Sequence, residues 1–282
     1  MWAAVTVMFG RTMRNRGQRL TTPIPNPRHT KPKAVVALLL TLAAGFVDVV
    51  GLLTVYKLFT AHMTGTTVHL GEQLIHRNWP AAAAAATVVL AFLVGSVLGR
   101  VMIEAASRAG VRRIASFTLV LESILLASVA WSGTHVFENR SADHGNLVVT
   151  SCLLAMLAAA MGLQTATLTR IGPLTIHTTF VTGMLNKLAQ LAAQWIFITH
   201  DLRHDGAKLN RLRKERSLVG RRARLISGIW LFYLPGALSG TWASLHWQLR
   251  SLYRACVILL FSVLVDQVRP LALEEEREQV EP

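Results

Sequence analysis

The stretch FTAHMTGTTVHLGEQLIH, from Phe59 to His76, decides the fold of this chain. At about 100° per residue its polar residues share one stripe and its apolar residues the other, which predicts a two-faced helix. The polar stripe consists of His62, Thr66, His69, Glu72, Gln73 and His76. The pair Thr64-Gly65 and the strongly apolar flanking segments indicate that this helix is broken inside a membrane protein.

A second copy of the pattern runs from Thr179 to Ile198. Aligning Thr64-Gly65 with Thr182-Gly183 places His69 on Lys187 and Glu72 on Gln190. The second stretch therefore keeps a polar face, but an amine and an amide replace the imidazole and the carboxylate of the first.

Each copy follows a long apolar segment that contains one polar residue expected to be buried. This residue is Asp48 in the first copy and Gln164 in the second. We interpret the chain as two related halves, each contributing one polar broken helix to a shared centre.

The composition favours a multi-pass membrane protein. Of the 282 residues, 52% are hydrophobic and 16% are charged, whereas soluble domains carry about 25% charged residues. The net charge of +14 is concentrated in Met1–Lys33 and Asp201–Arg224. Positive charge on the cytoplasmic side of membrane helices explains this pattern. We expect no nucleic-acid partner, because no nucleic-acid-binding motif accompanies the charge.

The apolar runs predict an all-α integral membrane protein with about six transmembrane helices plus two broken or re-entrant helices. About 20 apolar residues suffice to cross a bilayer. The expected spans are Ala34–Tyr56, Pro80–Ile103, Ile114–Trp131, Leu147–Thr169, Leu225–Trp247 and Leu252–Val265. The expected broken helices are Leu58–His76 and Leu174–Thr199.

Loop charge suggests the topology. If the N-terminus is cytoplasmic and neither broken helix crosses fully, both basic loops, Arg100–Arg113 and Asp201–Arg224, fall inside. The two halves then form an inverted repeat. If both broken helices cross, the chain has eight spans in a parallel repeat, and the first basic loop lies outside. We favour the inverted arrangement, in the inner (plasma) membrane.

The domain organisation follows from these segments. We expect a basic disordered tail at 1–33, a membrane domain at 34–268 and an acidic tail at 269–282. The membrane domain divides into halves at about 34–131 and 147–268. Its basic cytoplasmic loop, 201–224, is expected to touch anionic lipid headgroups.

Four motifs, in this order, resemble the YoaK-type family of bacterial multi-pass membrane proteins, a domain of unknown function. They are Gly45–Asp48, Phe59–Thr66, Met161–Gln164 and Thr178–Gly183. The resemblance covers about Ala34 to Val268. It implies an integral membrane protein and carries no established activity. The chain departs from the family at Thr66, where Asn is usual, and in the long basic insert.

The candidate functional groups are polar residues within apolar surroundings. A carboxylate inside a span costs about 2.5–3.5 kcal/mol, so Asp48 is expected to bind a proton or cation, or to serve as a structural partner. His62, His69, Glu72 and His76 could hold a metal or line a polar path. The path is favoured because no fourth ligand is visible and the second copy lacks metal ligands.

Glu122 stands alone in the middle of its apolar segment, and Arg254 is its expected partner in a structural ion pair. Gln164 is expected to hydrogen-bond between helices. The Thr-Gly pairs mark either helix breaks that bind ligands or packing seams of small residues.

The sequence therefore predicts a transporter or permease for a small polar solute or ion, with no cofactor, no metal and no enzyme motif. The expected path residues are Asp48, His62, Thr64, Gly65, His69, Glu72, Gln164, Thr182, Gly183, Lys187 and Gln190. The alternative is a non-transporting scaffold or regulator that acts through its basic cytoplasmic segments. The sequence leaves a homo-oligomer open.

Overall fold

The computed structural model describes residues 27–268, apart from 57, 112, 139–146, 168–169, 172–173, 176–178 and 205–208. The acidic tail and most of the basic tail expected from the sequence lie outside the described residues. The described part is helical except for a short antiparallel ladder in which β1 (Arg170–Ile171) pairs with β2 (Leu174–Thr175). The prediction of a helical membrane protein is confirmed at this level.

Most helices fall close to the expected segments, but α7 begins at Val181 instead of Leu174 and α8 at Leu209 instead of Leu225. The helices are α2 (Pro27–Gly51), α3 (Met63–Ile75), α4 (Trp79–Arg108), α5 (Ile114–Glu138), α6 (Leu147–Thr167), α7 (Val181–His204), α8 (Leu209–Trp247) and α9 (Leu252–Val268). A π-helical turn, η2 (Leu52–Tyr56), extends α2, and a 3₁₀ turn, η4 (Gln248–Ser251), joins α8 to α9.

Five helical segments of the described chain are long and apolar enough to cross a membrane. They are Pro32–Thr54, Trp79–Arg108, Ala115–Gly133, Val148–Thr167 and Leu209–Val268. The last of these contains both α8 and α9. The sequence predicted two spans in this stretch of 60 residues, whereas the structure has it as one continuous helical segment.

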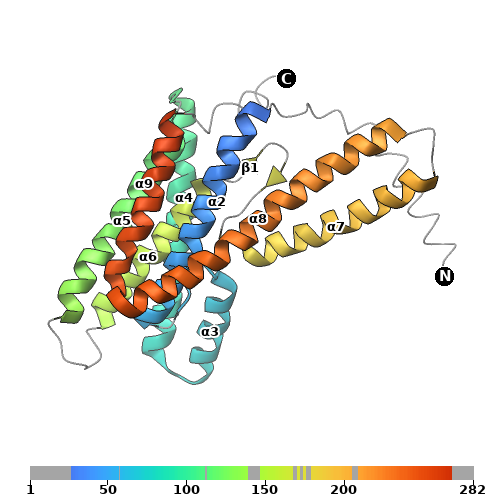
Figure 1. Cartoon of the computed structure of the whole chain (residues 1–282). Coiled ribbons are helices and arrows are strands. Elements are labelled where there is room, and N and C mark those ends of the chain that lie inside the picture. Colours follow the sequence, from blue (N-terminus) through green and yellow to red (C-terminus); the bar gives the residue numbers. More distant parts are fainter. Residues whose placement is uncertain are drawn as a thin grey trace.

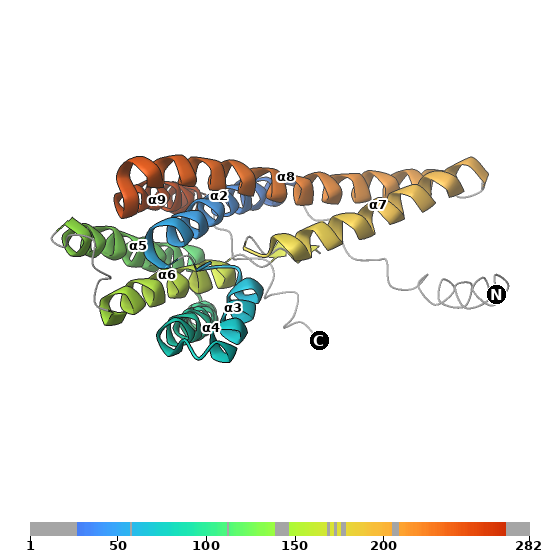
Figure 2. The same cartoon turned by 90° about the horizontal axis from the view of Figure 1, so that it is seen from below.

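The long helices stand side by side as a bundle, and the hairpin of α7 and α8 projects from one side of it (Figures 1 and 2). The basic stretch 201–224 was expected to be a loop, but it lies mainly in helices, because α8 begins at Leu209. Helix α2 begins and α4 ends at the same end of the bundle, while the α3–α4 turn lies at the opposite end (Figure 1).

The main helix pairs join one half of the chain to the other. Helix α2 packs along α8, and α4 packs along α6. Helix α5 packs on α9, while the short α3 rests on α4 and α7 rests on α8. If α2, α3, α4 and α5 are exchanged with α6, α7, α8 and α9 respectively, the same set of helix pairs results.

Glycines allow the two longest interfaces to close. A Cβ on Gly45 of α2 would overlap the carbonyl oxygen of Tyr233, and one on Gly236 of α8 would overlap that of Leu42. The α4–α6 interface has the same construction, at the following contacts: Gly162 against Phe92, Gly95 against Ala159, and Gly99 against Ala166 and Leu163. We call these interfaces the two glycine seams. Such close backbone approach is typical of membrane helices.

The opposite face of α4 is apolar and exposed, at Leu90, Leu93, Val94, Val97, Leu98 and Val101. In a membrane these side chains face lipid. The helix thus has one surface for the protein and another for the bilayer.

Candidate functional site

Asp48 holds the irregular backbone between α2 and α3. Its carboxylate is buried at 1% exposure. One oxygen accepts hydrogen bonds from the backbone N–H groups of Thr60 and Ala61, both at 2.8 Å, and from the Thr60 hydroxyl at 3.2 Å. The chain therefore turns back on itself around a single acid, which compensates the cost of burying that charge.

The other oxygen of Asp48 contacts two further side chains. His62 Nδ1 lies 2.5 Å away, and the hydroxyl of Tyr233 donates from α8 at 3.0 Å. The His62 ring packs edge-on against Phe59 and Tyr233. His62 lies outside the candidate spans, and its hydrogen bond with Asp48 raises its pKa, although desolvation works against this. His62 is half-buried, and it is the member of this cluster that can meet a solute.

The N-terminal end of α3 has open backbone donors. No side chain caps this helix, and Thr64 and Gly65 are exposed. Thr66 is buried and donates instead to the carbonyl of Phe59 at 2.9 Å. The first-turn N–H groups of a helix have no partner within the helix, so this end can bind a ligand or water.

The rest of the α3 stripe does not join this cluster. The half-buried His69 and the exposed Glu72 form a pair one turn apart, with Nδ1 and Oε2 3.3 Å from each other. Within the described residues, no group of three His, Cys, Asp or Glu side chains is close enough to hold a metal.

The polar residues of the second half are more dispersed. Gln164 is buried and donates to the carbonyl of Leu40 on α2 at 2.5 Å, as expected of an interhelical group. Its neighbour Thr165 shares a hydrogen bond of 2.8 Å with Thr179, just before α7. On α7, Thr182 and Gln190 are exposed, and Gly183 and Lys187 are half-buried.

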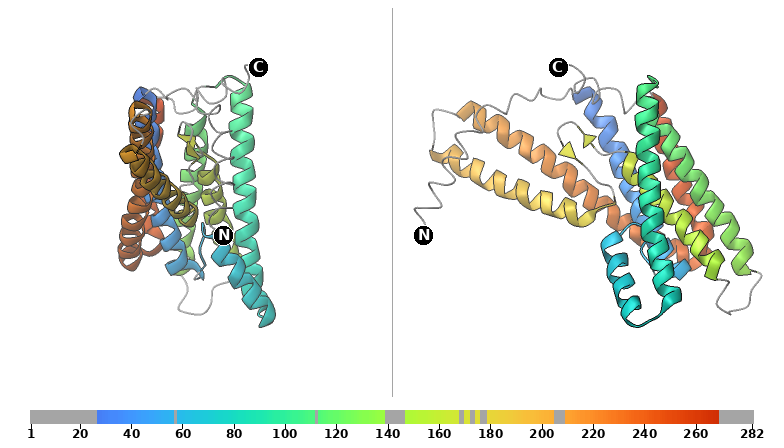
Figure 3. Two further views of the ribbon diagram at one scale, coloured as in Figure 1. Left: turned by 90° about the vertical axis from the view of Figure 1, so that its right-hand side faces the viewer. Right: turned by 180° about the vertical axis from the view of Figure 1, so that it is seen from behind.

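The N-terminal ends of α3 and α7 lie next to each other beside the bundle (Figures 1 and 3). This arrangement brings Thr64-Gly65 and Thr182-Gly183 into one region. His69, Glu72 and Gln190 lie further along their helices, away from these N-terminal ends.

Glu122 does not form the ion pair expected with Arg254. Arg254 places its guanidinium carbon 3.8 Å from the ring centre of Trp247. Both carboxyl oxygens of Glu122 are buried and have no hydrogen-bond partner in the described part of the chain. Cation–π stacking leaves the arginine near the helix end, where its charge remains solvated.

Sequence reasoning missed Tyr233, which closes the Asp48 cluster. Replacing Tyr233 with phenylalanine should remove one hydrogen bond to a charged group and lower the free energy of unfolding by about 1.5–3 kcal/mol. Denaturant titration of the purified protein measures this change. Tyr253→Phe, at an exposed position on α9, is the control and should be nearly neutral. Equal stability of both variants would contradict the role of Tyr233.

Comparison with known proteins gives one family and one curated relative. The family described as "Protein of unknown function (DUF1275)" matches residues 36–265. The UPF0700 transmembrane protein YoaK of Bacillus subtilis (strain 168) is 29% identical over 152 residues, which cover 54% of this chain and 64% of that protein. The chain thus matches less than two thirds of the relative's length. No solved structure matches the chain.

Proposed function

This chain belongs to the DUF1275 family of multi-pass membrane proteins, and on that premise we propose that it is a permease for a small polar solute or ion. The resemblance to YoaK-type proteins drawn from its four motifs is confirmed. The transport activity itself is our proposal.

One observation carries it: a helix break held by a buried acid presents polar groups beside an apolar bundle. Asp48 fixes residues 60–62, which leaves His62 half-exposed and the first turn of α3 uncapped. Interrupted helices with free backbone groups are the sites at which many transporters bind solutes and ions. The adjacent start of α7 supplies a second such end (Figure 2).

We propose further that the two halves form an inverted repeat of three spans and one re-entrant helix each. The two glycine seams support this, because Gly45 and Gly162 meet equivalent positions of α8 and α4. Three residues after each of these glycines, a polar side chain contacts another one 14 positions later. Asp48 contacts His62, and Thr165 contacts Thr179. The directions of α2 and α4 agree with an α3 that does not cross.

The basic end of the bundle is proposed to face the cytoplasm. Lys33, Arg108 and Arg113 lie at this end, toward which the arginine-rich start of α8 also points (Figure 1). This orientation satisfies the positive-inside bias, and it places the N-terminus inside and the α3–α4 turn outside.

The projecting hairpin of α7 and α8 favours the second candidate function, a scaffold that binds partners or anionic lipid. The first part of α8 carries Arg211, Arg213, Arg216, Arg221, Arg222 and Arg224. A scaffold would bind its partners through these charges and would not require water to reach the helix breaks.

Water access separates the two functions. Thr64→Cys and Thr182→Cys, each in a background lacking Cys152 and Cys256, should react with a membrane-impermeant thiol reagent if a path reaches both breaks. Val94→Cys, exposed on the lipid face of α4, is the control and should stay unlabelled. Protection of both threonine positions would rule out the path and favour the scaffold.

A further inference from the structure

Glu122 is a buried acid that the helix breaks do not use. It lies in α5 on the side packed against α9, with 0% of its surface exposed. Both of its oxygens lack hydrogen-bond partners among the described residues. Asp48, by contrast, has its charge fully compensated by its neighbours.

The groups around Glu122 provide no counter-charge. From α9, the thiol of Cys256 lies beside it and donates to the carbonyl of Ser123 at 3.5 Å. The other ionisable groups on the helices and turn packed against α5 lie elsewhere. Arg254 stacks on Trp247, Asp266 accepts from Ser116, and the remaining ones are exposed at Arg100, Glu104, Arg108, Cys152, Arg250 and Tyr253.

An ionised carboxylate in this position would be unstable. Burying an unpaired charge in an apolar interior costs so much that the group takes up a proton instead. Glu122 therefore exists as a neutral carboxylic acid in the packed state.

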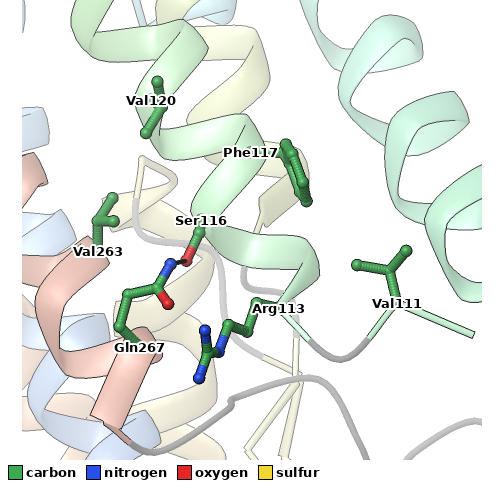
Figure 4. A pocket seen from close by; sticks show the side chains of 7 residues that line it. All are labelled: Val111, Arg113, Ser116, Phe117, Val120, Val263 and Gln267. Carbon is green, nitrogen blue, oxygen red and sulfur yellow. Dashed lines mark hydrogen bonds between the residues drawn. The ribbon is translucent and has the colours of Figure 1, made fainter.

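The α5–α9 interface also holds a pocket nearer the basic end of the bundle, and Glu122 is not among its lining residues. It has a volume of about 670 Å³ and is lined by Val111, Arg113, Ser116, Phe117, Val120, Val263 and Gln267. Figure 4 shows Ser116 and Val120 on α5 opposite Val263 and Gln267 on α9. Glu122 is six residues beyond Ser116, which is about 9 Å along the helix. The buried Leu119 lies between them in the sequence.

We propose that Glu122, held without a hydrogen-bond partner inside the helix bundle, is the proton-binding carboxyl of this protein. Its role as the coupling site of the permease rests on the proposed function, whereas its protonation does not. The sequence pointed to Asp48 or Glu72 for this role. Asp48 is engaged by five donors, and Glu72 is exposed on α3.

Dicyclohexylcarbodiimide, which reacts with protonated carboxyls in apolar surroundings, tests the proposal on the full chain in lipid nanodiscs. At neutral pH, mass spectrometry should find Glu122 modified and Glu104 unmodified, because Glu104 lies in water and is paired with Arg108 rather than in apolar surroundings. Glu122→Gln should abolish the modification, and Glu104→Gln should leave it unchanged. An unmodified Glu122 would overturn the proton site.

No substrate is needed, so these results are independent of transport. Cysteine labelling at both helix breaks together with an unmodified Glu122 would preserve the permease and reject only the proton site.

Discussion

Replacing Asp48 with alanine is expected to lower the free energy of unfolding by about 3–5 kcal/mol. The substitution leaves the backbone N–H groups of Thr60 and Ala61 buried without an acceptor, and each such orphan costs about 1–3 kcal/mol. It also removes the acceptor of Tyr233. Thermal and denaturant unfolding in detergent measure the loss.

Two further variants make this result specific. Asp48→Asn keeps an oxygen for the two backbone donors but turns an amide toward Tyr233 and His62, so its loss should be smaller. Glu72→Ala removes an exposed acid from α3 and should cost less than about 1 kcal/mol. If Asp48→Ala unfolded like the wild type, some other contact would have to hold the break.

Replacing Gly162 with leucine is expected to cost more than about 4 kcal/mol and to prevent α4 and α6 from docking. A Cβ at this position meets the carbonyl oxygen of Phe92 and the backbone nitrogen of Ser96, and neither can rotate away as a side chain would. The yield of monodisperse protein after size-exclusion chromatography reports the loss.

The same change in the other seam tests whether the halves are equivalent. Gly45→Leu should be as damaging as Gly162→Leu, because it meets the backbone of Tyr233 and Ala237. Gly220→Leu is the control: nothing lies within 4 Å of a Cβ there, and leucine favours the helix more than glycine does. A tolerated Gly45→Leu would count against the repeat.

Hydropathy and small-residue spacing were enough to predict most of the helices. Long apolar runs have few alternatives in lipid, since unsatisfied backbone groups are so costly there. The break was placed at Thr64-Gly65, but the irregular backbone lies earlier, between Leu52 and His62. The error arose because a Thr-Gly pair resembles a helix breaker, whereas the carboxylate of Asp48, 12 residues before Thr60, determines where the chain turns.

The partners of buried polar groups could not be predicted in the same way. Tyr233 lies 185 positions from Asp48, and only the pairing of α2 with α8 brings them together. Glu122 was matched with Arg254 on charge alone, but the arginine has an aromatic partner at the helix end. A tyrosine in an otherwise apolar helix was the available signal, since a buried hydroxyl needs a partner.

Because α2 packs along α8, which is far later in the chain, the order of synthesis delays this contact. Gly45 must wait for Tyr233, which is 188 residues later in the sequence (233 − 45). At about 5–20 residues per second, the ribosome needs roughly 10–40 s to supply it. During that interval α2 is already made but α8, the helix it packs along, is not. Asp48 can then accept hydrogen bonds only from the loop that follows α2, and not from Tyr233. Helix α2 is made early and is thus among the last to reach its final neighbour.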